Sequence, residues 1–126
     1  MRQPPVIAIV DDDDAVREAL FDLLQVEGLA AQTFRDGAEL LAYAAADDFA
    51  CVITDVRMGE VDGLELQRRL RARGYPVPVI FITSSVEDAT RIQAMAGGAA
   101  AWFTKPVADE ALLAALRSAL DATREA

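Results

Sequence analysis

The chain has 126 residues, which is enough for one domain with a single buried core. With 53% hydrophobic and 26% charged residues, it has the composition of a globular protein rather than a disordered one. A net charge of −9 argues against nucleic acid as a direct partner, and the lack of histidine excludes His-based acid–base catalysis and His metal sites.

The first strand and helix flank a run of four aspartates, residues 11–14. Val6–Val10 is a short apolar run of the strand type. After the aspartates, apolar residues recur with helical spacing at Val16, Leu20, Leu23 and Leu24. Gly28 is a plausible end for this helix. Asp13 and Asp14 suit the N-cap and the first turn of this helix, where carboxylates are stabilised by the helix dipole.

The second and third pairs of a strand and a helix follow in the same order. Ala30–Thr33 reads as a strand, and Asp36–Ala45 as a helix on its Ala and Leu content, with Asp36 as a cap. Ala50–Thr54 is the third strand. A helix follows it, with Leu66 and Leu70 on one face before Gly74.

The last two pairs complete the pattern. Val79–Ile82 and Ala100–Phe103 are the fourth and fifth strands. The helix between them carries an apolar face before Gly97-Gly98, made of Ile92, Met95 and Ala96. Leu113, Leu116 and Leu120 mark the final helix. Near-continuous apolar strands are typical of a parallel sheet that is covered on both faces.

Five strand–helix repeats predict one α/β domain over residues 1–126, with 1–5 as a short N-terminal tail. The fold class is the flavodoxin-like (βα)5 doubly wound domain, with a parallel sheet of order 2-1-3-4-5 and helices on both faces. The five apolar residues after the tail are too few for a signal sequence, and no run approaches the roughly 20 residues needed to span a membrane. The single cysteine, Cys51, lies in an apolar run and is expected in the core of a cytoplasmic protein without membrane contact.

Polar residues collect where four of the strands end. They are Asp11-Asp12, Thr54-Asp55, Thr83-Ser84-Ser85 and Thr104-Lys105-Pro106. The carboxyl ends of parallel strands share one edge of the sheet, and open α/β sheets bind ligands there, at the point where the strand order reverses. With order 2-1-3-4-5 the crevice lies between the first and third strands.

The residue types at this edge suit phosphoryl transfer. Asp11, Asp12 and Asp55 form a hard, anionic oxygen site of the kind that Mg²⁺ prefers. Lys105 and Thr83 supply a positive charge and a hydroxyl group for phosphoryl oxygens. A carboxylate beside Mg²⁺ can itself accept a phosphoryl group and form an aspartyl phosphate.

Five motifs in this order resemble the receiver domains of bacterial two-component response regulators. They are Val10-Asp11-Asp12, the run Ile53-Thr54-Asp55-Val56-Arg57-Met58, Asp62-Gly63, Ile82-Thr83-Ser84 and Thr104-Lys105-Pro106. The resemblance covers nearly the whole chain. The Val-Arg-Met that follows Asp55 is most similar to the nitrogen-fixation type of regulator.

The resemblance implies a role for each site residue. Asp55 corresponds to the phosphoacceptor, Asp12 to a direct Mg²⁺ ligand and Asp11 to a ligand acting largely through water. The backbone carbonyl of Arg57 would complete the metal site. Thr83 and Lys105 would bind the phosphoryl group, with a cis Lys105–Pro106 bond.

The resemblance also implies a switch and a set of partners. Trp102 stands where the family has its switching aromatic residue, usually Tyr or Phe, and works there with Thr83. The donor would be a phosphohistidine on a sensor histidine kinase or phosphotransfer protein. A phosphorylation-dependent homodimer is open, as is an effector domain further along a longer regulator. Members of the family catalyse their own phosphorylation and dephosphorylation, so the domain would not be a turnover enzyme.

Two departures and two alternatives stand beside this interpretation. Gly59 replaces a common proline, which predicts a more mobile loop after the acceptor, and Trp102 is bulkier than the usual switch residue. One alternative is a haloacid-dehalogenase-type phosphatase, since Asp11-Asp12-Asp13 contains the Asp-x-Asp pattern of that superfamily and would make Asp11 the nucleophile. The other is a receiver-like interaction module that is never phosphorylated.

Overall fold

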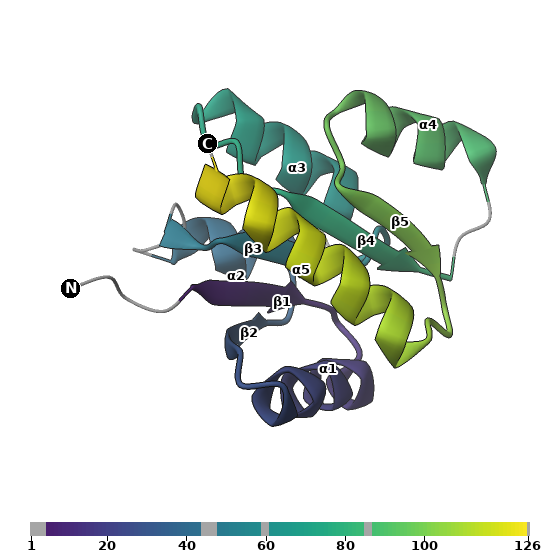
Figure 1. Ribbon diagram of the computed structural model, residues 1–126. Helices are drawn as coiled ribbons and strands as arrows, with labels where there is room; N and C mark the ends of the chain where they lie inside the picture. Colours follow the sequence, from purple (N-terminus) through teal and green to yellow (C-terminus); the bar gives the residue numbers. More distant parts are fainter. Residues whose placement is uncertain (1–4, 44–47, 59–60, 85–86, 126) are drawn as a thin grey trace.

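The computed structural model describes residues 5–43, 48–58, 61–84 and 87–125. Its five parallel strands are β1 (Val6–Val10), β2 (Ala30–Phe34), β3 (Cys51–Thr54), β4 (Val79–Thr83) and β5 (Ala101–Thr104). The helices are α1 (Asp14–Val26), α2 (Gly37–Ala42), α3 (Gly63–Ala72), α4 (Asp88–Ala96) and α5 (Asp109–Glu125). The sheet order β2-β1-β3-β4-β5 confirms the predicted topology (Figure 1).

Alternate residues of the strands face two separate apolar layers. Ile7, Ile9 and Ile53 point toward α1 and α5, whose Leu24 and Leu116 are fully buried on that side. The other strand residues pack against α2, α3 and α4 on the opposite face, where Phe81 is the largest of the fully buried side chains. The sheet is therefore covered on both faces, as predicted from its apolar strands.

Cys51 lies fully buried in the layer under α1 and α5. Burial raises the pKa of its thiol to about 12, against a smaller opposing effect of a backbone hydrogen bond with Val52. A thiol in this setting stays protonated and unreactive. The prediction of a core cysteine is confirmed.

The element boundaries move by one residue at several strand ends. Strands β4 and β5 run on to Thr83 and Thr104, so both threonines are part of the sheet rather than of the following loops. The predicted Asp36–Ala45 helix is shorter, because Asp36 is its N-cap and Tyr43 ends it. The last two residues of that prediction, 44 and 45, lie outside the described residues.

Helix α4 forms where predicted, but its expected apolar face is not the buried one. Ile92 is 64% exposed and Met95 48% exposed, whereas Ala94 is fully buried. The reason is the close approach of α3, where the buried Gln67 amide donates a hydrogen bond to the Ala94 carbonyl at 3.1 Å. The side of α4 that faces α3 is therefore the one that carries Ala94, and the larger apolar side chains Ile92 and Met95 face outward.

The Asp62-Gly63 pair begins α3 against the backbone of β3. The Asp62 carboxylate caps the helix by accepting from the Glu65 amide at 2.8 Å, and the Gly63 amide donates to the Val56 carbonyl at 2.7 Å. A Cβ atom at Gly63 would lie 2.2 Å from the Asp55 carbonyl oxygen. This glycine is required because α3 starts in contact with the residue that follows β3.

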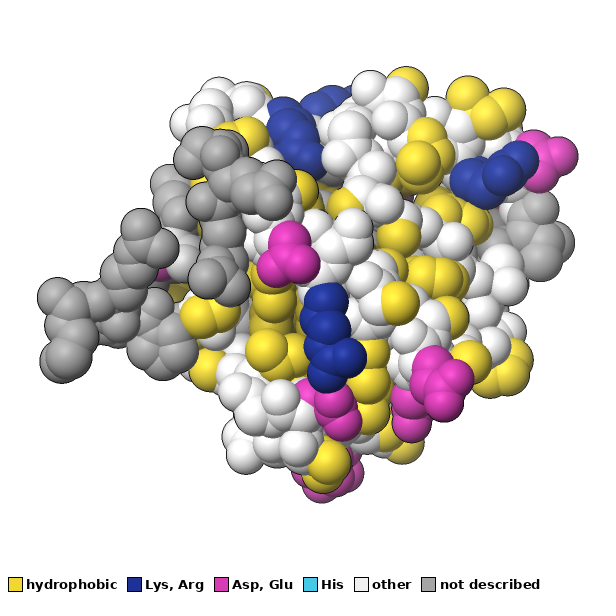
Figure 2. Space-filling view, in the orientation of Figure 1, with side chains coloured by type: hydrophobic (Ala, Val, Ile, Leu, Met, Phe, Trp, Pro, Cys, Tyr) yellow, Lys and Arg dark blue, Asp and Glu magenta, His cyan; other side chains and the backbone are white. Residues whose placement is uncertain are grey.

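On the face covered by α5, basic and acidic side chains are spread among apolar and other groups, and some of them lie against a group of opposite charge (Figure 2). One pair joins the helices on this side, because Arg117 of α5 donates to Glu27 at the end of α1 at 2.6 Å. An exposed pair of this kind contributes at most about 1 kcal/mol. Among the described residues, no helix combines the length and the apolar character that crossing a membrane requires.

We expect Gly63→Ala to destabilise the domain by about 2–3 kcal/mol, because the new methyl group overlaps a backbone carbonyl and α3 must shift. Urea unfolding measures the free energy of unfolding. Gly74→Ala is the matched control, since Gly74 has a positive φ of 77° but open space around it. Its expected cost is only about 1 kcal/mol. An equal or smaller effect at Gly63 would show that the close approach is not the constraint.

Candidate functional site

The strand ends bring the predicted site residues to one edge of the sheet. Backbone pairing continues past the strands there: the Asp11 amide donates to the Phe34 carbonyl at 3.1 Å, and the Asp55 amide to Val10 at 3.2 Å. On the other side the Lys105 amide donates to the Thr83 carbonyl at 2.8 Å. These bonds fix the backbone from which the polar side chains project, in agreement with a site at the carboxyl edge.

Lys105 lies between two buried carboxylates. Its Nζ is 2.7 Å from Asp55 Oδ2 and 3.2 Å from Asp11 Oδ2. Asp11 is 2% exposed and Asp55 7% exposed, so both acids depend on partners inside the protein. A lysine that follows β5 thus balances acids that follow β1 and β3.

Burial has different consequences for the pKa of Asp11 and for that of Lys105. Burial raises the pKa of the Asp11 carboxyl above its usual range, and the Asp13 amide and Lys105 only partly oppose it. Burial alone would lower the pKa of the Lys105 ammonium, but its contacts with Asp55 and Asp11 raise it overall. The lysine therefore stays charged, while the Asp11 carboxylate is held at some cost in stability.

Three carboxylates converge in a way that fits a hard divalent cation. Oxygen atoms of Asp11, Asp12 and Asp55 lie within 4.8 Å of one another. One oxygen of each buried acid is held by a backbone amide. Asp55 Oδ1 accepts from the Val56 amide at 2.6 Å, and Asp11 Oδ1 accepts from the Asp13 amide at 2.9 Å. The Asp12 side chain is exposed. An all-oxygen donor set of this charge, open to water on one side, suits Mg²⁺.

The other two aspartates of the run belong to the helix. Asp13 is the N-cap of α1, and its carboxylate accepts from the amides of Ala15 and Val16. Asp14 is the acidic residue of the first turn. The predicted division of the four aspartates is confirmed for Asp13 and Asp14.

The remaining predicted residues surround the carboxylates. Thr83 is fully buried at the end of β4, and Trp102 is half-buried on β5 with its ring 5.6 Å from that of Phe81. The Lys105–Pro106 bond is cis, as the resemblance implied. Arg57 directs its exposed side chain to Glu87 at 2.9 Å. Gly59, for which a more mobile loop was predicted, lies outside the described residues.

Two contacts at the site escaped sequence reasoning. The Thr54 hydroxyl donates to the Asp55 carbonyl at 2.8 Å, and Arg17 of α1 donates to the Asp11 carbonyl at 2.8 Å. Thr54 was visible as a polar residue at a strand end. Arg17 carried no such signal, because an arginine between apolar helix positions usually faces solvent.

Comparison with known proteins identifies a family for this chain. Residues 7–117 match the response regulator receiver domain family. The chain is 41% identical over 115 residues to the response regulator protein TodT of Pseudomonas putida, covering 91% of this chain and 51% of TodT. It is 40% identical over 119 residues to the transcriptional regulatory protein FixJ of Azorhizobium caulinodans, covering 94% of this chain and 56% of FixJ.

A solved structure agrees in fold along almost the whole chain. The chemotaxis protein CheY4 of Vibrio cholerae superposes with a TM-score of 0.85 at 30% identity, covering 94% of this chain and all of CheY4. The chain spans about half the length of TodT and FixJ, so the match concerns one part of those regulators. On this family match, supported by the strand order and the lysine-bridged acids, the chain belongs to the receiver domains of two-component response regulators.

Proposed function

We propose that Asp55 accepts a phosphoryl group from a phosphohistidine of a sensor histidine kinase or phosphotransfer protein. A carboxylate oxygen of Asp55 attacks phosphorus, an O–P bond forms and the P–N bond breaks, and the imidazole nitrogen keeps the electron pair and takes up a proton. The donor histidine lies outside these 126 residues, which contain no histidine. The observation that carries the proposal is Lys105, held between the Asp55 and Asp11 carboxylates.

Lys105 and Thr83 would receive the transferred group. The Lys105 ammonium already lies 2.7 Å from the Asp55 carboxylate, so only a short movement is needed for it to contact a phosphoryl oxygen. There it would offset charge that develops during transfer. Thr83 ends the strand next to β3 and would offer its hydroxyl to a second oxygen. Both groups act by position and charge.

Asp12, Asp55 and the Arg57 carbonyl would hold Mg²⁺, with Asp11 acting largely through water. The mutual spacing of the three carboxylates, within 4.8 Å, supports this assignment. When bound, the ion offsets negative charge on the acids and on the phosphoryl oxygens. The protein's own part is to place the acids, and Lys105 brings a positive charge to the two buried ones.

The result of phosphorylation would be a changed protein contact on the side of α4 and β5. Ile92 and Met95 already expose apolar surface on α4, and α4 buries a single side chain, Ala94. Movement of Thr83 toward the phosphoryl group and of Trp102 on the neighbouring strand would reshape this side. A phosphorylation-dependent homodimer and a contact to an effector domain are both outputs of this kind. The domain would act in the cytoplasm as a self-acting phosphoacceptor, not as a turnover enzyme.

The first test is incubation with Mg²⁺ and a small phosphodonor such as acetyl phosphate, followed by intact mass. We expect an adduct of about 80 Da, absent in Asp55→Asn and present at lower yield in Asp11→Asn. Steady release of phosphate that only Asp11→Asn abolishes would favour the phosphatase alternative instead. An unmodified mass with every donor and no Mg²⁺ binding would favour the interaction module that is never phosphorylated.

The cost of burying Asp11 predicts a pH-dependent stability of the metal-free chain. Because burial raises its pKa, the unfolded state loses this proton first, and the native state loses stability as the pH rises through the native pKa. In EDTA at pH 7, Asp11→Asn should therefore raise the free energy of unfolding by an amount on the order of 1 kcal/mol, which raises the Tm by a few degrees. The difference should vanish below the ordinary carboxyl pKa of about 4.

Thermal melts of both proteins across this pH range make the measurement. Asp22→Asn, a change at an exposed position of α1, is the control for removing one charge from an acidic chain. Its Tm should stay close to that of the wild type at every pH. A lower Tm for Asp11→Asn at pH 7 would mean that the Lys105 contact outweighs the cost of burial.

Trp102 provides an optical test of the switch, because it is the only tryptophan. We expect Mg²⁺ with phosphodonor to change its emission, since its ring lies against Phe81 on the strand that ends at Thr83. Asp55→Asn should respond to Mg²⁺ but not to the donor. An 80-Da adduct, as above, with unchanged emission would identify Trp102 as a static core residue.

A further inference from the structure

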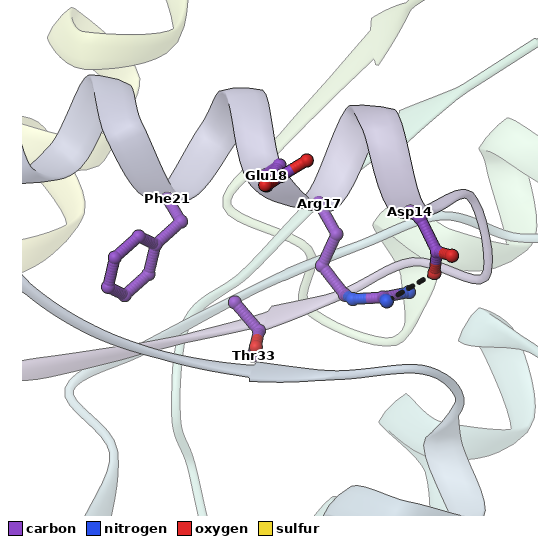
Figure 3. Close-up of a pocket in the computed structure, with 5 residues that line it drawn as sticks. All are labelled: Asp14, Arg17, Glu18, Phe21 and Thr33. Carbon is purple, nitrogen blue, oxygen red and sulfur yellow. Dashed lines mark hydrogen bonds and ion pairs between the residues drawn. The ribbon is translucent and has the colours of Figure 1, made fainter.

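Arg17 has an unusual position for a charged residue on an outer helix. Its side chain is only 16% exposed and is turned back along α1 toward the loop that follows β1. Figure 3 shows it directed to Asp14, with Phe21 further along the helix and Thr33 on the neighbouring strand. One guanidinium nitrogen pairs with the Asp14 carboxylate, and the other donates to the Asp11 carbonyl at 2.8 Å.

We propose that Arg17 is a positioning residue for the metal site, acting through the peptide unit that joins Asp11 to Asp12. The Asp11 carbonyl belongs to that planar unit, so a hydrogen bond to its oxygen limits the turning of the unit about the N–Cα bond of Asp12. This rotation sets the direction in which the Cα–Cβ bond of Asp12 leaves the backbone, and with it the region that the Asp12 carboxylate can reach. The inference rests on the proposed function, in which Asp12 binds Mg²⁺.

The other residues of the loop have restraints that Asp12 does not share. The Asp11 amide is held by the Phe34 carbonyl, and the Asp11 carboxylate by Lys105 and the Asp13 amide. Asp13 is fixed as the N-cap of α1. Within the described parts of the chain, the Asp12 side chain forms no hydrogen bond or ion pair, so its place depends on the backbone on either side. Arg17 is the side chain that acts on the peptide unit before it.

Arginine suits this task better than lysine. Its planar group offers donors in a fixed fork, so one residue can hold the Asp11 carbonyl and the Asp14 carboxylate together. The Asp14 contact also balances the charge of the guanidinium. A lysine could reach one acceptor but would not fix the same two groups in one geometry.

Charge and position predict opposite effects of removing Arg17. As a cation near the site, Arg17 repels Mg²⁺, so charge alone would make Arg17→Met bind the ion more tightly. As a positioning residue, its loss should weaken binding, because the Asp12 carboxylate samples more directions. Arg17→Lys keeps the charge and loses the fork, so the proposal predicts weaker binding here too, where charge alone predicts no change.

The test is titration of the unphosphorylated full chain with Mg²⁺, by calorimetry and by Trp102 emission. We expect the Kd of Arg17→Met and of Arg17→Lys to rise about tenfold, the range seen for residues that support metal ligands. Glu18→Gln is the matched control on the same helix, since Glu18 lines the same surface pocket as Arg17 (Figure 3) and, among the described residues, its side chain forms no hydrogen bond or ion pair with the loop at residues 11–13. Its Kd should stay within about twofold of the wild type.

The outcomes separate the inference from the proposed function. If the wild type binds Mg²⁺ and forms the Asp55 adduct while both Arg17 variants bind as well or better, the positioning role is wrong and the proposed function stands. If the wild type binds no Mg²⁺, the proposed function itself fails. Thermal melts show whether each variant folds. If Arg17→Met does not fold, the Kd of Arg17→Lys, which keeps a long charged side chain, decides whether Arg17 positions the metal site.

Discussion

The site is organised around one charged group, the Lys105 ammonium, inserted between two buried carboxylates. Asp11 and Asp55 leave neighbouring strands, and without a cation between them their charges would repel in a poorly solvated place. The lysine comes from a loop 94 residues after Asp11 and 50 residues after Asp55. The strand order, the backbone bonds beyond the strand ends and the glycine at the start of α3 all hold the atoms that make this arrangement possible.

The strands that carry this arrangement are packed on both faces, whereas α4 is packed against the rest of the domain by few buried side chains. The strands are buried on both faces, with large side chains such as Phe81 and Leu116 filling the two layers. Helix α4 instead buries one alanine and relies on the Gln67 hydrogen bond to its backbone. Little apolar area would be exposed by a shift of this helix, so the free-energy cost of moving it is low compared with disturbing the sheet. This asymmetry supports the proposed change of protein contact on the side of α4.

Four adjacent aspartates are compatible because each has a different partner. Asp11 is held by Lys105 and a backbone amide, and Asp13 and Asp14 by the start of α1 and by Arg17. Asp12 alone faces solvent without such a contact among the described residues. A carboxylate that is kept in place by its neighbours while its own oxygens stay available is what a metal ligand needs. The loop thus combines structural acids and an open acid within four residues.

The sequence by itself determined the fold and the set of chemical groups at the site. Apolar periods located each strand and helix to within a few residues, and the alternation of the two types left a parallel sheet with one carboxyl edge. Because the chain reverses direction through a helix after every strand, polar residues at strand ends had to meet at that edge. Asp11, Asp55 and Lys105 could therefore be grouped before any distance was known.

Tertiary structure alone decided which side chains touch and which faces are covered. The prediction of the buried face of α4 was wrong because periodicity does not tell that Gln67 of α3 bonds to the backbone at Ala94, on the side of the helix away from Ile92 and Met95. The need for Gly63 and the contact of Arg17 with the Asp11 carbonyl were likewise invisible, since both depend on backbone atoms of other segments. Sequence patterns record which residues are apolar or charged, whereas these contacts depend on distances between elements that only packing fixes.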